Sequence, residues 1–144
     1  MFPALKTDTL AECFIRVARK NWPRRCISDA SGMSLNYGRT LCGALALAEH
    51  LDKLTAAHER VGIMLPPSVL AALANIAVTL LGKVPVNLSY VATAESRAYA
   101  IEQCGIKCVI SSRALAEKVN NLGAMPGLVL IEDVAAWFNR LVKV

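Results

Sequence analysis

The strongest constraint in this chain is an uncharged stretch that two adjacent prolines interrupt. Between Arg60 and Lys83 no side chain carries a charge, and Pro66 and Pro67 divide the run near its start. An unbroken apolar run of roughly 20 residues would be long enough to cross a bilayer as a helix. The prolines remove two backbone donors and favour extended geometry in the residue before them. The stretch is therefore predicted to form a strand, a turn and a helix, each too short to span a membrane.

The residues on the two sides of the prolines have the pattern of a βαβ unit. Residues 61–65 form a short apolar run with β-branched members, typical of a strand that helices cover on both faces. Ser68 can cap a helix over 69–81, in which leucine and alanine recur every three or four residues. Lys83 follows as a positive charge near the negative end of that helix. A second strand is expected over 84–88, and the crossover implies a parallel sheet.

The rest of the chain supplies a prologue and further alternating elements. In residues 1–58 we expect a helix with a capping box of Thr9 and Glu12, a β-hairpin around the turn at 29–32, and a helix over 37–51. In residues 59–144 the pattern continues with helices over 93–104, 112–119 and 134–142 and with strands over 107–110 and 128–131. The predicted fold class is α/β, a three-layer sandwich with a mainly parallel sheet preceded by a helix and a β-hairpin.

Length, net charge and cysteine content limit the number of domains, the kinds of partner and the cellular compartment that we expect. A chain of 144 residues is long enough for one domain with a core. Its net charge of +5 is modest, and no aromatic residues alternate with the charges, which argues against a nucleic-acid partner. Five cysteines, odd in number and scattered, indicate a reduced, cytoplasmic setting rather than a disulfide framework. The first residues lack the pattern of a secretory signal.

Histidine and cysteine are the first candidates for a reactive site. His50 and His58 flank a polar connection without partners at metal-ligand spacing, so surface positions explain them. Cys104 and Cys108 stand one residue too far apart for a redox dithiol. We expect these two thiols to be buried and structural.

Polar residues that follow predicted strands are the second group of candidates, because open α/β sheets bind ligands at the carboxyl ends of their strands. Ser111 and Ser112 follow one strand, and a helix N-cap at Ser112 would explain the pair without a function. Asn87 and Ser89 follow another and are candidates to border an acyl or nucleotide pocket in an intact enzyme.

A basic group lies early in the chain, and two explanations stay open for it. It comprises Arg16, Arg19, Lys20, Arg24 and Arg25. These side chains are suited to an acidic carrier protein or a phospholipid surface, and they equally fit a solvated helix face.

Three blocks in one order resemble the N-terminal part of the adenylate-forming acyl ligases. The blocks are TLAECFIRVARKNWPRRCISDASGMSLNYGRTLCGALALAEHL, RVGIMLPPSVLAALANIAVTLLGKVPVNLS and AESRAYAIEQCGIKCVISSRALAEK. This family of AMP-binding enzymes includes acyl-CoA synthetases, acyl-acyl-carrier-protein synthetases and peptide-synthetase adenylation domains. The tail PGLVLIEDV is most similar to the synthetase half of bifunctional acyltransferase/acyl-carrier-protein synthetases. Asn36, Arg39 and Pro67 differ from the residues usual in the family, and all three stand at helix starts or turns.

The resemblance implies an ATP-dependent ligase whose supporting scaffold this chain provides. Such an enzyme forms an acyl-adenylate from a fatty or other carboxylic acid and passes the acyl group to a thiol of CoA or of carrier-protein phosphopantetheine, with ATP and Mg²⁺. The family's Ser/Thr- and Gly-rich phosphate loop has no counterpart in these residues. We therefore expect a fragment that is inactive alone, carries no catalytic, cofactor-binding or metal residues, and has the rest of the ligase chain as its partner.

Two other classes of function were weighed from the same residues. A free-standing flavodoxin-like or receiver-like module would need a phosphate loop or clustered acidic residues after its first parallel strand, where this chain has LPPS. A self-associating chain would follow if sheet edges and apolar faces were left bare.

Overall fold

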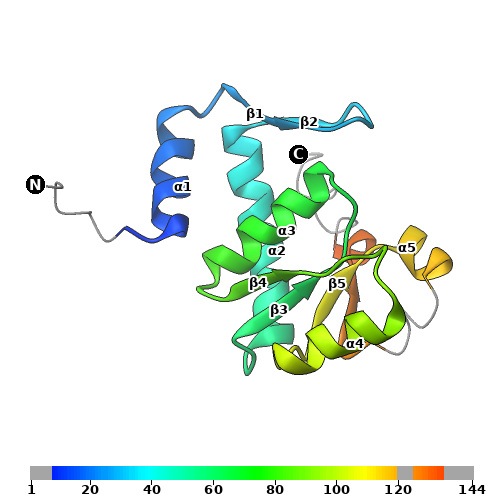
Figure 1. Ribbon diagram of the computed structural model, residues 1–144. Coiled ribbons are helices and arrows are strands. Elements are labelled where there is room, and N and C mark those ends of the chain that lie inside the picture. The colour runs from blue at the N-terminus through cyan, green and yellow to red at the C-terminus, as the bar shows by residue number, and fades with distance from the viewer. Residues whose placement is uncertain (1–7, 120–124, 135–144) are drawn as a thin grey trace, which may run out of the picture.

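The computed structural model describes residues 8–119 and 125–134 (Figure 1). Helix α1 (Leu10–Lys20) leads into the hairpin of β1 (Arg25–Ser28) and β2 (Ser34–Asn36) and then into the long helix α2 (Tyr37–Thr55). The elements then alternate as β3 (Arg60–Ile63), α3 (Val69–Leu80), β4 (Val84–Asn87), α4 (Ala94–Gln103), β5 (Val109–Ser111), α5 (Arg113–Lys118) and β6 (Leu128–Leu130). Residues 131–134 are again helical.

The central sheet has the strand order β4-β3-β5-β6, and each neighbouring pair is parallel. The predicted strand, turn and helix around Pro66 and Pro67 are confirmed, with Ser68 accepting a hydrogen bond from the Ala71 amide at 3.1 Å. Among the described residues, no helix combines the length and the apolar character that crossing a bilayer requires. Pro85 lies in the edge strand β4, the position in a sheet where a residue without an amide hydrogen is tolerated.

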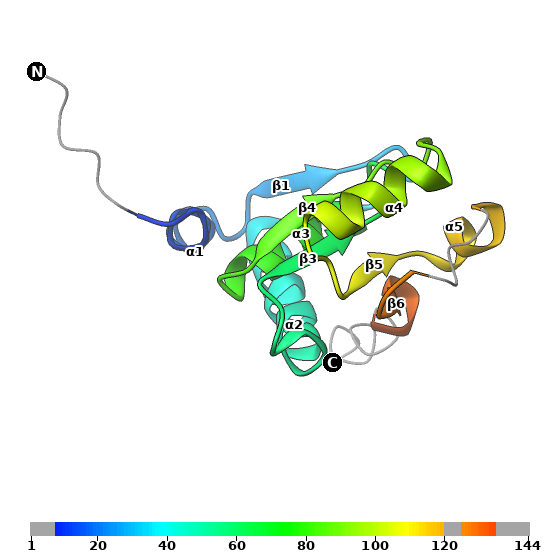
Figure 2. The ribbon, with the colours of Figure 1, turned by 60° about the horizontal axis from the view of Figure 1, so that its bottom comes forward.

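Helices cover both faces of this sheet, which confirms the predicted three-layer arrangement. Alternate residues of a strand point to opposite faces, so Val61 and Ile63 join α2 and α3 in one core. On the other face Val109 and Ile106 pack with Leu115 of α5 and with partly buried residues of α4. Figure 2 shows α2 and α4 on opposite sides of the strands.

A tryptophan between α1 and the hairpin packs directly on the start of α2. The capping box of Thr9 and Glu12 is present, and Gly32 turns the hairpin with a φ of 87°. Between helix and hairpin, the Trp22 ring lies directly on Gly38, where an added Cβ would stand 2.5 Å from the ring atom Cε2. Only glycine at the first turn of α2 allows this contact.

Several predicted boundaries differ from the structure, among them the end of β3, which is Ile63 rather than residue 65. Helix α2 continues to Thr55, one turn past the predicted end at 51, because the Thr55 hydroxyl is buried and donates to the Leu51 carbonyl at 2.8 Å. Strand β5 occupies Val109–Ser111 instead of 107–110. The last helix begins by residue 131, and the remainder of the predicted 134–142 helix lies outside the described residues.

Lys83 does not serve the helix end that its position in the sequence suggested. Its Nζ donates to the carbonyls of Thr55 at 2.7 Å and His58 at 2.8 Å, at the carboxyl end of α2. Gly82, with a φ of 72°, turns the chain so that the long lysine side chain reaches the neighbouring helix rather than α3. The lysine charge therefore fastens α2 to the α3–β4 turn.

Candidate functional site

The strand order creates a switch point at the carboxyl ends of β3 and β5. From β3 the chain crosses through α3 to β4 on one side, and from β4 it returns through α4 to β5 on the other side of β3. In open α/β sheets, ligands bind in the crevice that such diverging connections leave. This edge of the sheet is therefore where a functional site is expected.

Ser111 lies at this switch point, where its side chain links the ends of β5 and β3. Its side chain is fully buried, and Oγ donates to the Met64 carbonyl just beyond β3 at 2.9 Å. Ser112 caps α5, with Oγ accepting from the Leu115 amide at 3.3 Å, as predicted. Each of these hydrogen bonds joins a serine hydroxyl to a backbone group, so both serines help to order this edge of the sheet.

Asp29 of the hairpin reaches the same edge, which the sequence analysis missed. Its Oδ2 accepts from the Val69 amide at the start of α3 at 2.9 Å, and Oδ1 accepts from the Ser31 hydroxyl at 2.5 Å. These hydrogen bonds, that from Ser31 first, lower the pKa of the Asp29 carboxyl below its ordinary value. A carboxylate therefore occupies the N-terminus of α3, where an anionic ligand would otherwise be favoured.

A second carboxylate occupies the N-terminus of α5. Both oxygens of Glu132 accept from the Arg113 amide, at 2.9 and 3.0 Å, and the Arg113 guanidinium pairs with Asp133 at 2.8 Å. The two helix starts that flank the switch point thus already hold negative groups from this chain. These carboxylates stabilise the two helix starts at this edge of the sheet. Because they are negative, they disfavour the binding of a phosphate group at the same two amides.

Asn87 lies at the carboxyl end of β4 and is paired with a neighbour. Its side-chain amide exchanges two hydrogen bonds with Asn75 of α3, at 2.9 and 3.1 Å. Ser89 is exposed two residues further on. A border of an acyl or nucleotide pocket at these residues stays a prediction.

The histidines and cysteines are not brought together. His50 is exposed, and His58 contributes only its backbone carbonyl to Lys83. Cys108 is buried in the α2–α3 core, where burial raises the pKa of its thiol, whereas Cys104 is half-buried and packs on the opposite face. Within residues 8–119 and 125–134, no three His, Cys, Asp or Glu side chains are arranged to hold a metal ion.

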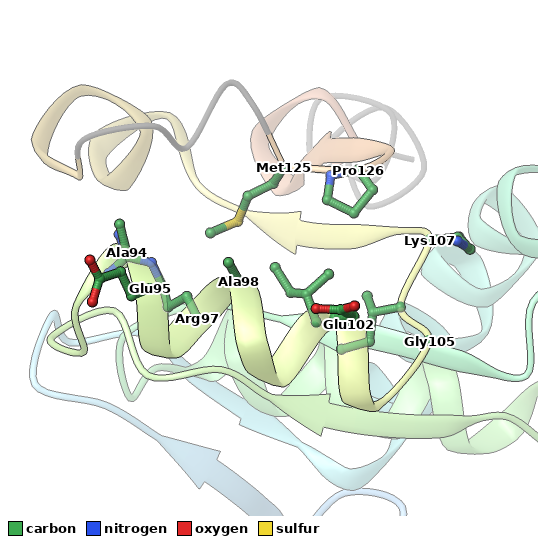
Figure 3. A pocket seen from close by; sticks show the side chains of 11 residues that line it. Ala94, Glu95, Arg97, Ala98, Glu102, Gly105, Lys107, Met125 and Pro126 are labelled. Carbon is green, nitrogen blue, oxygen red and sulfur yellow. The ribbon is translucent and has the colours of Figure 1, made fainter.

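A cavity of about 640 Å³ lies beside α4, at a place that sequence reasoning did not predict (Figure 3). Ala98 of the helix points toward Met125 across it. Ile101 also lines the cavity, as do Glu95, Glu102 and Lys107. Its other side is formed by residues that precede β5 and β6, away from the switch point. The lining combines apolar side chains with two acids, Glu95 and Glu102, and two bases, Arg97 and Lys107.

Comparison with known proteins places this fold in a family. A profile described as "AMP-binding enzyme" matches residues 14–141. The chain belongs to the AMP-binding enzyme family. The resemblance seen in the LPPS and CGIKC blocks is thereby confirmed at the level of the family, while the bifunctional acyltransferase/acyl-carrier-protein synthetase subtype stays a prediction.

Several solved structures share the arrangement of most of this chain. VinN superposes with a TM-score of 0.77 at 19% identity, over 93% of this chain and 36% of its own. A benzoate CoA ligase from Burkholderia xenovorans LB400 gives 0.73 at 24% identity, over 85% and 25%. O-succinylbenzoate coenzyme A synthetase from Bacillus subtilis, in complex with ATP and magnesium ion, gives 0.73 at 15% identity, over 84% and 33%. At these identities the likeness establishes the fold, and the chain spans at most about a third of the length of these structures.

Proposed function

We propose that the protein to which this chain contributes is an ATP-dependent ligase that activates a carboxylic acid, with a fatty acid as the substrate class. The carboxylate attacks the α-phosphorus of Mg-ATP, pyrophosphate leaves, and an acyl-adenylate forms. A thiol of CoA or of carrier-protein phosphopantetheine then attacks the acyl carbon and releases AMP. The observation that carries the proposal is the family match over residues 14–141.

The role proposed for these residues is to support the active site. Among the described residues, the amides of Val69 and Arg113 at the two helix starts beside the switch point already bind Asp29 and Glu132. Phosphate clamps, Mg²⁺ ligands and the positioned substrate supply the rate enhancement in chemistry of this kind. We therefore propose that those groups come from outside this chain, and that the 144-residue polypeptide alone is inactive.

Calorimetric titration of the 144-residue chain with Mg-ATP tests this division of roles. The expected result is no measurable heat of binding at micromolar ATP. Micromolar affinity would refute the proposal that the nucleotide site lies elsewhere. The purified chain is also expected to be colourless, whereas a bound flavin would favour the flavodoxin-like alternative.

Exchange of labelled pyrophosphate into ATP tests the proposed reaction itself. The assay compares the 144-residue chain with the longest product that its gene encodes, each with a series of fatty and aromatic acids. Acid-dependent exchange by the longer product alone supports the ligase and the scaffold role together. Subsequent addition of CoA or of a phosphopantetheinylated carrier protein identifies the acceptor thiol by mass spectrometry.

A further inference from the structure

Positive charge gathers at one corner of the molecule, where α1 passes into the hairpin. Residues 13–28 carry five basic side chains and no acidic one, although the formal net charge of the whole chain is only +5. Five exposed cations lie on the segments that meet at this turn: Arg19 and Lys20 end α1, Arg24 and Arg25 begin the hairpin, and Arg39 follows Gly38, on which the Trp22 ring lies. We call these five residues the basic corner.

The acidic groups nearest to the corner in sequence are engaged elsewhere. Asp8 pairs with Arg16 at 2.7 Å, Glu12 closes the capping box of α1, and Asp29 binds the start of α3. Among the residues that the structure describes, none of the five cations of the basic corner has a salt-bridge partner. Their charge is therefore directed to solvent.

The backbone that carries these cations is fixed, with Trp22 at its centre. The Arg24 amide donates to Asn21 at 2.8 Å, the Tyr37 amide to Arg24 at 2.9 Å, and the Gly38 amide to Trp22 at 3.0 Å. One face of the indole lies on Gly38, yet 47% of the residue remains exposed. The Trp22 side chain is therefore already ordered beside the cations, so it loses little conformational entropy when a ligand binds.

We infer that the basic corner with Trp22 binds an anionic phospholipid surface. Basic side chains are attracted to anionic headgroups, and indoles favour the boundary between headgroups and acyl chains. Neither the cavity beside α4 nor the one between α1 and α3 includes a residue of the corner. A turn whose cations and indole are exposed suits a planar surface better than a peptide or an acidic helix, which would need a cleft.

The corner also sets which end of the molecule would face the lipid. The hairpin that starts at Arg25 carries Asp29 to the first turn of α3, beyond the carboxyl end of β3. Bound lipid would thus lie at the same end as the switch point. If the proposed ligase function is correct, an acid dissolved in the bilayer would arrive near the edge of the sheet that binds ligands in such folds.

Vesicle binding of the intact chain tests the inference without ATP or acid. Residue 137 is also a tryptophan, so the measurement uses a Trp137→Phe background in which Trp22 is the only indole. Vesicles with equal parts of phosphatidylglycerol and phosphatidylcholine are expected to shift Trp22 emission to the blue. Brominated acyl chains should quench that emission, and pure phosphatidylcholine should bind at least about tenfold more weakly.

Charge reversal inside and outside the corner tests whether binding depends on this surface or only on the net charge of the chain. Arg24→Glu with Arg25→Glu should reduce partitioning by more than about tenfold, since each basic residue near an anionic surface contributes severalfold. The control pair Lys53→Glu with Lys107→Glu has the same net charge but changes cations at the amino ends of the strands. It should reduce partitioning by no more than about threefold.

Three results would overturn the inference, with circular dichroism verifying that each variant is folded. They are equal loss of binding in both pairs, vesicle binding without quenching by brominated lipid, and tighter binding to soluble polyglutamate than to the vesicles. The last result would assign the corner to an acidic protein instead. Because these assays involve no nucleotide, they stand or fall separately from the pyrophosphate exchange.

Discussion

The face of the sheet under α2 and α3 is filled, whereas the face under α4 and α5 is not. Fifteen buried residues form the first core, and five form the second, beside a cavity of about 640 Å³. Helix α3 presents Ala74 and Ala77 to the strands, so its backbone can lie close to them. Helix α4 instead has Glu95 and Glu102 along the cavity. A parallel sheet therefore does not ensure two equally packed faces, because the side chains of the covering helix decide how closely it approaches.

The largest test of this comparison removes one large side chain from each face. Leu73→Ala in α3 should lower the free energy of unfolding by about 2–5 kcal/mol, since the buried site cannot collapse around the missing atoms. Ile101→Ala, in the wall of the existing cavity, should cost only about 1 kcal/mol. Urea denaturation at unchanged m-value measures both, and equal losses would contradict the difference between the faces.

The opposite change, adding volume, should reverse in sign between the faces. Ala77→Leu adds three carbons to a side chain that has no exposed surface, at a cost of about 1–3 kcal/mol. Ala98→Leu projects into the cavity and should be neutral or stabilise the fold by up to about 1 kcal/mol. Thermal unfolding followed by circular dichroism compares the two variants. A loss of stability at Ala98 would mean that the cavity does not accept added atoms.

The elements that could be predicted from the sequence are those whose signals are local. Adjacent prolines, the Ser68 cap and the leucine–alanine spacing act over a few residues, and the structure has the strand, turn and helix that they predict. The end of α2 was misplaced because the last turn depends on burial of Thr55 and on a lysine 28 residues away. The local sequence after residue 51 is polar, and it indicates neither the burial of Thr55 nor its contact with Lys83.

The candidate site was less predictable for the same reason. Ser112 as a helix cap follows from its neighbours, whereas the contact of Asp29 with Val69 joins residues 40 positions apart. The only local signal for Asp29 was its place at the start of an Asp-Ala-Ser-Gly turn, which predicts the bond to Ser31 but not the one to α3. The cavity beside α4 forms where Met125 approaches that helix, and neither the sequence of α4 nor the residues around Met125 predict this contact.

A smaller test concerns the hydrogen bonds by which Lys83 joins the end of α2 to the turn between α3 and β4. Lys83→Met keeps the apolar stem but leaves the carbonyls of Thr55 and His58 without their charged donor. The free energy of unfolding should fall by about 1 kcal/mol, below the usual value for a charged hydrogen bond because the lysine is partly exposed. Lys53→Met, an exposed lysine in the last turn of the same helix, is the control and should cost less than about 0.5 kcal/mol. Equal costs would mean that Lys83 contributes only general charge at the helix end.

The smallest expected change is a dependence on pH that Asp29 gives to the attachment of the hairpin. Its folded-state pKa lies below the ordinary 3.8, so its stabilising effect is complete above 3.8 and is lost as the pH falls through the lowered folded value. Asp29→Asn should therefore be less stable than the natural chain by a constant amount at pH 5–7. That difference should shrink below pH 3.8. Urea midpoints measured across this range decide the matter, because a difference that persists unchanged to pH 2 would assign the effect of Asp29 to shape rather than to its charge. In that case the packing of Ile27 and Leu35 on the core would hold the hairpin without help from the Asp29 charge.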